Sequence, residues 1–142
     1  VAGYPEKHFE APNMRSDIHF LKKKIEAGAD YIVTQMFFDN QKYFDFVERC
    51  RKNEINVPII PGLKPIATKN QLTLLPQRFY LNLPEQLVEQ LIKCKNNDAV
   101  RQVGVEWAIQ QCRELIDFGV PCLHFYTMGK SDNVQKIVGS LV

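Results

Sequence analysis

The residues whose side chains could do chemistry gather in four short segments of the chain. They are GYPEKH at residues 3–8, TQMFFD at 34–39, IPGLKP at 60–65 and HFYTM at 124–128. Each segment ends or directly follows an apolar stretch typical of a strand, so its polar side chains would lie where a strand passes into a loop. Ligands of parallel α/β proteins bind at this carboxyl edge, and the four segments are therefore the first candidates for a site.

Gln35 is the only strongly polar residue in the apolar run 31–38 and is the leading candidate for a ligand contact. Strand alternation would place Val33, Gln35 and Phe37 on one face. A primary amide offers donors and an acceptor to the edge of a flat heterocycle without adding charge. The competing interpretation is a core glutamine whose amide is satisfied by the backbone.

A second group of candidates lies between residues 4 and 24. Asp17 could accept hydrogen bonds from ribose hydroxyls, and Lys23 and Lys24 could neutralise a pyrophosphate. Taken alone, however, the run Lys22–Lys24 is typical of a solvated helix face, and His8 is typical of a loop histidine.

Turn and cap signals divide the chain into alternating strands and helices. Strands are predicted at 1–4, 31–38, 57–61 and 122–127, the second and last of them buried. Helices are predicted at about 17–27 with Ser16 as N-cap, from Asp39 or Asn40 to about Lys52, at 68–75, from Pro84 to Lys93, at 98–118 with Asp98 as N-cap, and from Ser131 or Asp132 to Leu141. Gly28 and Gly119 stand where left-handed C-terminal caps are wanted.

This alternation predicts parallel strands joined by right-handed crossovers, hence an α/β fold. A doubly wound sheet would usually carry a glycine-rich phosphate turn after its first strand, and the sequence contains neither GxGxxG nor GxxxxGK[ST]. We therefore favour a (β/α)8 TIM barrel. Such a barrel needs about 250 residues, so four strands in 142 residues would form half of one.

Composition narrows the classes of partner. The net charge of +2 comes from 18 basic and 16 acidic residues spread along the chain, which predicts binding to neither nucleic acid nor a membrane. No apolar run is long enough to span a bilayer and no signal peptide is evident, so a cytoplasmic protein is expected. The four cysteines lack the close pairs of zinc sites, and we expect buried free thiols and no metal. The chain opens on an apolar stretch without an initiator methionine, which suggests part of a longer protein.

The ordered series GYPEKH, AGADYIVTQMFFD, IIPGLKP and HFYTM resembles the methylenetetrahydrofolate reductases across essentially the whole chain. The resemblance implies the C-terminal half of a catalytic (β/α)8 barrel that binds FAD. It also implies an enzyme, expected to be homo-oligomeric when complete, that passes a hydride from NADH or NADPH through the flavin to 5,10-methylenetetrahydrofolate. No residue in the sequence selects between the two nicotinamide cofactors.

The resemblance also assigns roles to individual residues. Gln35 would contact the folate pterin and the nicotinamide in turn, Gln71 would contact the folate from a mobile loop, and Lys130 stands where relatives often have an arginine near the folate. FAD would be held by a set of loop and helix residues, namely Tyr4, His8, Ala11, Asp17, Lys23 and Lys24. For Gln71 and Lys130, the interpretation as exposed polar surface residues without a binding role is equally well supported by the sequence.

Some features depart from the family pattern. Phe20 replaces a small polar residue that meets the cofactor in some relatives, and Leu75 replaces a phenylalanine that closes over the nicotinamide cofactor. The family's general-acid glutamate and its flavin-adjacent aspartate belong to the N-terminal half, so this chain contains no catalytic residue and is expected to be inactive alone. Two other functions compete: a different flavin-dependent barrel, such as a proline dehydrogenase-like protein, and a non-catalytic binding module.

Overall fold

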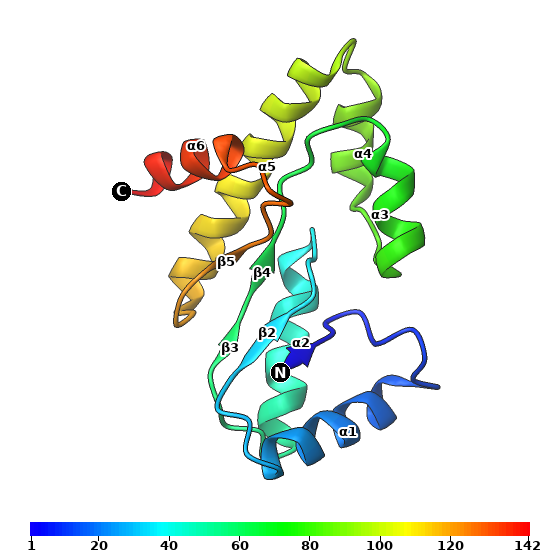
Figure 1. Cartoon of the computed structure of the whole chain (residues 1–142), viewed down its shortest axis with the longest axis vertical. Helices are drawn as coiled ribbons and strands as arrows, with labels where there is room; N and C mark the ends of the chain where they lie inside the picture. The colour runs from blue at the N-terminus through cyan, green and yellow to red at the C-terminus, as the bar shows by residue number, and fades with distance from the viewer.

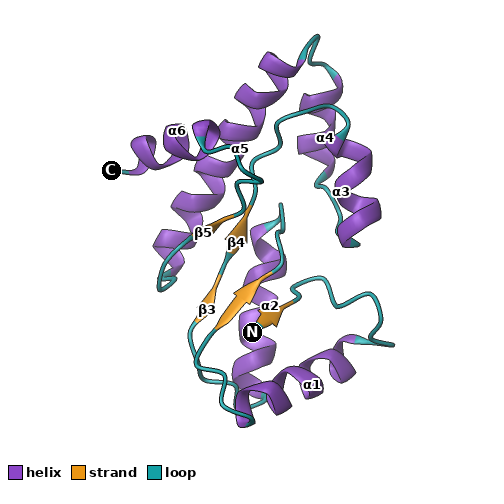
Figure 2. Cartoon of the chain, in the orientation of Figure 1, coloured by secondary structure: helices purple, strands orange, loops and turns teal.

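Short parallel strands run through the middle of the molecule, and helices lie around them (Figures 1 and 2). The computed structural model describes all residues, 1–142. The strands are β1 (Ala2–Gly3), β2 (Ile32–Thr34), β3 (Ile59–Ile60), β4 (Gly62–Leu63) and β5 (His124–Phe125). None of the helices is both long and apolar enough to cross a membrane.

The strands pair in the order in which they follow along the chain. β1 pairs with β2 and β2 with β3, while β4 pairs with β5, and every pair is parallel. An unbroken chain order with helical crossovers is the winding of a barrel, whereas a doubly wound sheet reverses direction at a switch point. The predicted α/β fold with parallel strands, arranged as part of a TIM barrel, is confirmed.

The single strand predicted at 57–61 is two short strands separated by Pro61. Proline has no N–H to continue a ladder, and its carbonyl accepts instead from His124 N at 3.0 Å. Gly62 N then turns back to donate to Thr34 Oγ1 at 2.9 Å. β3 therefore faces β2 while β4 faces β5, and the chain has five short strands where four were expected.

The helices are α1 (Met14–Glu26), α2 (Asn40–Lys52), α3 (Gln71–Phe79), α4 (Glu85–Ile92), α5 (Asn97–Phe118) and α6 (Asp132–Leu141). The predicted cap Asp39 is confirmed, as are the positive φ angles of Gly28 and Gly119. Ser131 stands at the N-cap position of α6 as predicted, but its side chain makes no capping hydrogen bond.

Three predicted helix starts are wrong. The N-cap of α1 is Asn13, whose Oδ1 accepts from Ser16 N at 2.9 Å, so Ser16 lies inside the helix. Asn96 caps α5 in the same way by accepting from Ala99 N, which places Asp98 in the first turn. In both cases an earlier asparagine outcompetes the predicted residue as cap. The helix expected at 68–75 is displaced to 71–79 and includes Pro76.

Two apolar clusters fill the interior. The larger one packs β2, β3 and β4 against α1, α2, α5 and α6, and the smaller one joins the segment after β2 to α3, α4 and the start of α5. Ile32 and Phe37 both belong to the larger cluster, whereas Val33 and Gln35 are half-buried outside it. Phe37 therefore does not share the face predicted for it with Val33 and Gln35, because β2 ends at Thr34 and alternation stops there.

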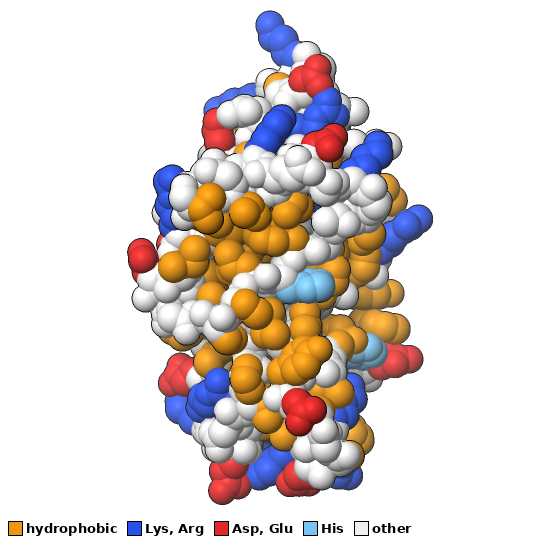
Figure 3. All heavy atoms as spheres, turned by 60° about the vertical axis from the view of Figure 1, so that its left-hand side comes forward, with side chains coloured by type: hydrophobic (Ala, Val, Ile, Leu, Met, Phe, Trp, Pro, Cys, Tyr) orange, Lys and Arg blue, Asp and Glu red, His pale blue; other side chains and the backbone are white.

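The last strand is not buried as predicted. His124 and Cys122 are exposed and Phe125 is half-buried, because β5 forms an outer edge with a partner on one side only. All four cysteines are free thiols. Cys50, Cys94 and Cys112 are buried as expected, whereas Cys122 is exposed. The side of the molecule on which β5 and α6 lie carries a broad band of apolar side chains (Figure 3).

Candidate functional site

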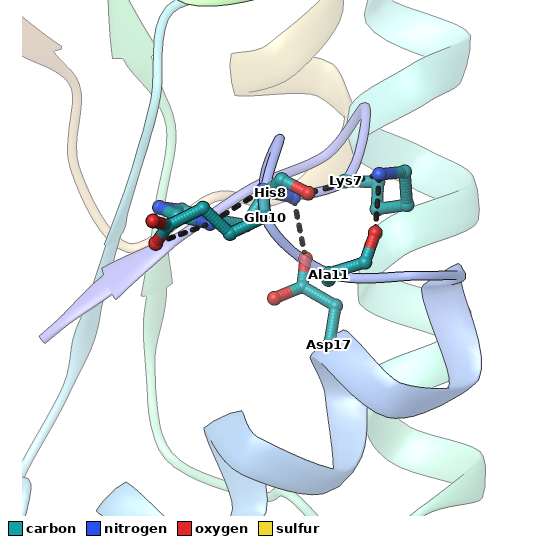
Figure 4. A network of polar contacts seen from close by, with 5 residues as sticks. All are labelled: Lys7, His8, Glu10, Ala11 and Asp17. Carbon is teal, nitrogen blue, oxygen red and sulfur yellow. Dashed lines mark hydrogen bonds and ion pairs between the residues drawn. The ribbon is translucent and has the colours of Figure 1, made fainter.

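The loop between β1 and α1 is folded around His8 (Figure 4). Lys7 adopts a positive φ of 78°, which lets its ammonium donate to the carbonyls of His8 at 3.0 Å and Ala11 at 2.6 Å. The carboxylate of Asp17, in the first turn of α1, accepts from His8 N at 2.9 Å through Oδ2. His8 and Ala11 of the loop and Asp17 of α1, which were predicted to hold one cofactor, thus lie together.

Aromatic rings extend this loop on both sides. The Tyr4 ring lies edge-on to the His8 ring with centroids 4.6 Å apart, and Phe9 stacks on Tyr80 at 4.8 Å. Because Tyr80 follows α3, the stack ties the loop to the distant end of that helix. Tyr4 therefore joins His8, Ala11 and Asp17 in one folded loop.

The three consecutive lysines of α1 divide into two kinds. Lys22 pairs with Glu54 at 2.8 Å, and this contact raises the lysine pKa and lowers that of the carboxyl. Lys23 and Lys24 are exposed and have no ion-pair partner, and the Lys23 ammonium lies 5.5 Å from the centre of the Phe20 ring. Both lysines of the predicted cofactor set, Lys23 and Lys24, are thus free, whereas their neighbour Lys22 is held by Glu54 in the turn after α2.

Gln35 lies directly after β2, where it continues the ladder by donating from its backbone N to Gly3 O at 2.8 Å. Its side-chain Oε1 accepts from Met36 N at 3.0 Å, which fixes the amide at the end of the strand. The amide nitrogen makes no hydrogen bond within the chain. The amide is thus half satisfied by backbone, and one donor group is available to a ligand.

Gln71 and Lys130 line one pocket of about 330 Å³ between the loop after β4 and the loop after β5. Gln71 is the first residue of α3, where its Oε1 accepts from Ala67 N at 2.7 Å, so it is an ordered helix residue in this structure. Lys130 is exposed at the rim. Gln35 does not line this pocket.

Tyr126 connects the strand that precedes Gln35 with this pocket. Its hydroxyl donates to Thr34 O at 2.7 Å, and its ring lines the same pocket as Gln71. Burial raises the pKa of Tyr126, and the neighbouring hydroxyl of Tyr4 adds to the increase. The two groups of predicted residues therefore approach each other through Tyr4 and Tyr126.

Several charged residues of the four motifs were not predicted as site residues, and for two of them, Glu6 and Lys64, burial shifts the pKa. Glu6 accepts from Asn82 N at 2.9 Å through Oε1, while its buried Oε2 has no partner, and burial raises the pKa of this carboxyl. Lys64 is only 8% exposed at the floor of the pocket. The local sequence does not distinguish these two charges from those of ordinary loops, because their packing involves residues far along the chain.

The two departures from the family pattern take different places. Phe20 is exposed on α1, and its ring lies beside Lys23. Leu75 is buried in the smaller apolar cluster, so its side chain serves as core of α3 and offers no open surface for stacking.

Comparison with known proteins gives a consistent assignment. A family model described as methylenetetrahydrofolate reductase matches residues 1–142. The chain is 37% identical to a probable methylenetetrahydrofolate reductase (NADPH) of Caenorhabditis elegans and 38% identical to methylenetetrahydrofolate reductase (NADH) 1 of Arabidopsis thaliana, over 99% and 96% of its length. It is 37% identical to the 5,10-methylenetetrahydrofolate reductase of Buchnera aphidicola subsp. Acyrthosiphon pisum, over 96% of its length.

The chain spans only part of these relatives: 21% of the nematode protein, 24% of the plant protein and 47% of the bacterial one. Among solved structures, it is similar to an uncharacterized protein from Clostridium thermocellum that binds two copies of 5-methyl-5,6,7,8-tetrahydrofolic acid. The TM-score is 0.62 at 18% identity, covering 97% of this chain and 50% of that one. This similarity supports the fold.

Proposed function

Since the chain belongs to the methylenetetrahydrofolate reductase family, we propose that it is the C-terminal half of the catalytic barrel of an FAD-dependent reductase. The complete protein would convert 5,10-methylenetetrahydrofolate to 5-methyltetrahydrofolate with NADH or NADPH. The observation that carries this proposal is the match of the family model to all 142 residues. The solved protein of similar fold, which binds a methylated tetrahydrofolate, supports the substrate class.

FAD fits the groups that the chain offers between residues 4 and 24. Asp17 uses one carboxylate oxygen on His8 N and keeps the other for a ribose hydroxyl, while Lys23 and Lys24 carry uncompensated charge for a pyrophosphate. Tyr4 and His8 add two neighbouring aromatic rings to the same loop. The bound flavin would supply the hydride chemistry, and this chain would hold and orient it.

Gln35 would orient the reacting heterocycle by donating from its amide nitrogen, because the oxygen of the same amide is held by Met36 N. Gln71 and Lys130 would contact the rest of the folate from the pocket between the two loops. The proton needed by the folate would come from the other half of the barrel. We therefore expect the isolated chain to be inactive, and the complete protein to act in the cytosol, where free thiols such as Cys50 and Cys112 are common.

The proposal is tested on the complete polypeptide by anaerobic stopped-flow spectroscopy. The purified protein should be yellow, its flavin should be reduced by NADH or NADPH, and methylenetetrahydrofolate should reoxidise it. Gln35→Glu should slow both half-reactions about 10²–10³-fold, because it removes a preorganised donor to the reacting partner. Flavin content should stay near normal, since other residues hold FAD.

Gln90→Glu is the matched control, because Gln90 is exposed on α4 away from both groups of site residues. It makes the same chemical change and should leave both rates unaltered. A complete protein that binds no flavin, or whose reduced flavin is not reoxidised by methylenetetrahydrofolate, would refute the proposed function. Wild-type rates in Gln35→Glu would reduce Gln35 to a satisfied core residue.

A further inference from the structure

Lys64 is a buried lysine without a partner. It directly follows β4, its side chain is 8% exposed, and its ammonium makes no hydrogen bond or ion pair within the chain. Burial alone lowers its pKa, with no neighbouring charge to offset the effect. A lysine is almost never buried to this extent unless it is paired, so its position calls for a partner from outside the chain.

The backbone around Lys64 is fixed on both sides. Leu63 pairs with Phe125, and Leu63 O accepts from Tyr126 N at 2.8 Å. Two residues further on, the backbone of Ile66 packs so closely on Gly104 of α5 that a Cβ there would lie 2.0 Å from Ile66 O. The backbone that carries Lys64 is therefore held in place, and its side chain is preorganised beside the pocket that it lines.

The pocket that Lys64 lines is rich in uncompensated positive charge. Arg101 pairs with Asp98 outside the lining, and the only acid of the lining is Asp132. The cations without an ion-pair partner are Lys64, Lys130 and Lys136. They stand at two depths, since Lys64 is buried at the floor whereas the other two are exposed at the rim. This arrangement suits a ligand that bears more than one anionic group.

We propose that Lys64 binds a carboxylate of the substrate's glutamate, with the rim lysines facing its second carboxylate. This inference rests on the proposed function, because a tetrahydrofolate ends in a glutamate with two carboxylates. The phosphates of FAD already have candidate partners in Lys23 and Lys24, on a different loop. Gln71 adds a neutral donor to the same pocket, because its Oε1 is occupied by Ala67 N and its amide nitrogen is not. Lys64 thus acts as an anchor for the tail of the substrate and takes no part in hydride transfer.

The test compares two ligands on the complete, flavin-loaded polypeptide by calorimetry. They are 5-methyltetrahydrofolate and its bis-amide, in which both glutamate carboxylates are neutral. Lys64→Met keeps the length of the side chain but removes its charge, so it should weaken binding of the first ligand about tenfold or more and leave binding of the bis-amide unchanged. Lys93→Met, at an exposed position beyond α4, should alter neither dissociation constant.

A second readout is independent of ligands. Because Lys64→Met removes an unpaired buried charge, the ligand-free variant should unfold at the same temperature as the wild type or higher. A retained melting temperature together with a selective loss for the carboxylate ligand supports the proposal and excludes misfolding as the cause.

Other outcomes overturn the inference. If Lys64→Met lost equal affinity for both ligands, Lys64 would act through packing. If it lost no affinity for either, the aliphatic part of the Lys64 side chain would only cover apolar surface. A weaker affinity for NADH or NADPH, with folate binding unchanged, would assign the ammonium to a phosphate. If the wild-type protein binds neither 5-methyltetrahydrofolate nor its bis-amide, the proposed function itself is wrong, and so is the role proposed for Lys64.

Discussion

Asp17 and Lys24 are the residues on which FAD retention should depend most directly. The Asp17 carboxylate orders the loop with one oxygen and has its other oxygen available to the cofactor, and Asp17→Ala removes both. Lys24→Ala removes a cation that has no ion-pair partner. Each change should weaken FAD binding in the complete polypeptide, because a charge-assisted hydrogen bond shielded from water contributes about 1.5–3 kcal/mol. The measurement is flavin fluorescence released on dilution.

Lys22→Ala provides the control for this experiment. Lys22 belongs to the same run of three lysines, but its ammonium is held by Glu54 in the turn after α2. Its removal should leave FAD dissociation unchanged. Equal FAD release from the Lys22 and Lys24 variants would indicate a general effect of helix charge, and unchanged release from both Asp17→Ala and Lys24→Ala would make these residues ordinary surface charges.

Glu6 should make stability depend on pH in the direction opposite to that of a salt-bridged acid. Its folded-state pKa lies above the ordinary value of 4.5 because of burial, with the hydrogen bond from Asn82 N opposing the increase only in part. The folded state therefore holds the proton more tightly than the unfolded state. The favourable contribution is complete below about pH 4.5 and is lost as the pH rises through the folded pKa.

Glu6→Gln keeps the acceptor for Asn82 N and removes the charge, so it should raise the melting temperature near pH 7 and give no gain at pH 4. The measurement is the difference in melting temperature between variant and wild type from pH 4 to pH 7. The other carboxyl groups titrate in both proteins, so their contributions cancel in this difference. Glu89→Gln, at an exposed position on α4, is the control. A difference between Glu6→Gln and wild type that does not change with pH would contradict the predicted linkage.

Site residues whose positions depend on neighbouring residues could be predicted from the sequence, whereas those whose burial depends on residues distant in the sequence could not. The sequence placed Gln35 at a strand end and Asp17 in the first turn of a helix, since both positions are fixed by local pattern. Burial of Glu6 and Lys64 depends on residues far along the chain: Asn82 contacts Glu6, and Gly104 admits the segment after Lys64. No local pattern reports such packing, so neither residue was predicted as part of the site.

At the scale of elements, the helices were easier to predict than the strands. The asparagine caps Asn13 and Asn96 shifted two starts by a few residues, which is a local competition between neighbouring cap formers. Strands were predicted too long because apolar runs such as Met36–Phe38 continue into a buried loop that has the composition of a strand. The break at Pro61 was visible in the sequence, but its effect, a change of pairing partner, depends on where β5 lies.

The packing of α5 on the segment after β4 can be tested at Gly104. A Cβ at this position would lie 2.0 Å from the backbone oxygen of Ile66, which cannot rotate away as a side chain could. Gly104→Ala should therefore destabilise the protein by about 1–3 kcal/mol despite the better helix propensity of alanine. Gly139→Ala on α6 meets no atom within 4 Å and should stabilise by about 0.5–1 kcal/mol. Denaturant unfolding of both variants compares them, and equal stabilities would show that the contact is loose.

At the scale of the whole molecule, the strands form two short sheets and do not close into a ring. β1 pairs only with β2 and β5 only with β4, so each presents one unpaired edge. Exposed large apolar side chains include Val1 before β1 as well as Phe118 and Val138 on α5 and α6. Both features are expected where the remaining strands and helices of a closed barrel would pack.

We therefore expect the isolated chain of 142 residues to self-associate, because unpaired edges and an apolar face (Figure 3) both seek partners. Light scattering should give a mass above 16.4 kDa that increases with concentration. Adding the N-terminal half of the barrel as a separate polypeptide should replace these oligomers with a one-to-one complex, since the missing strands satisfy both edges at once. His124→Lys, which places a charge on the exposed edge strand β5, should reduce self-association. A chain that stays a dilute monomer, and does not bind the other half, would mean that its edges need no partner and would count against the half-barrel assignment.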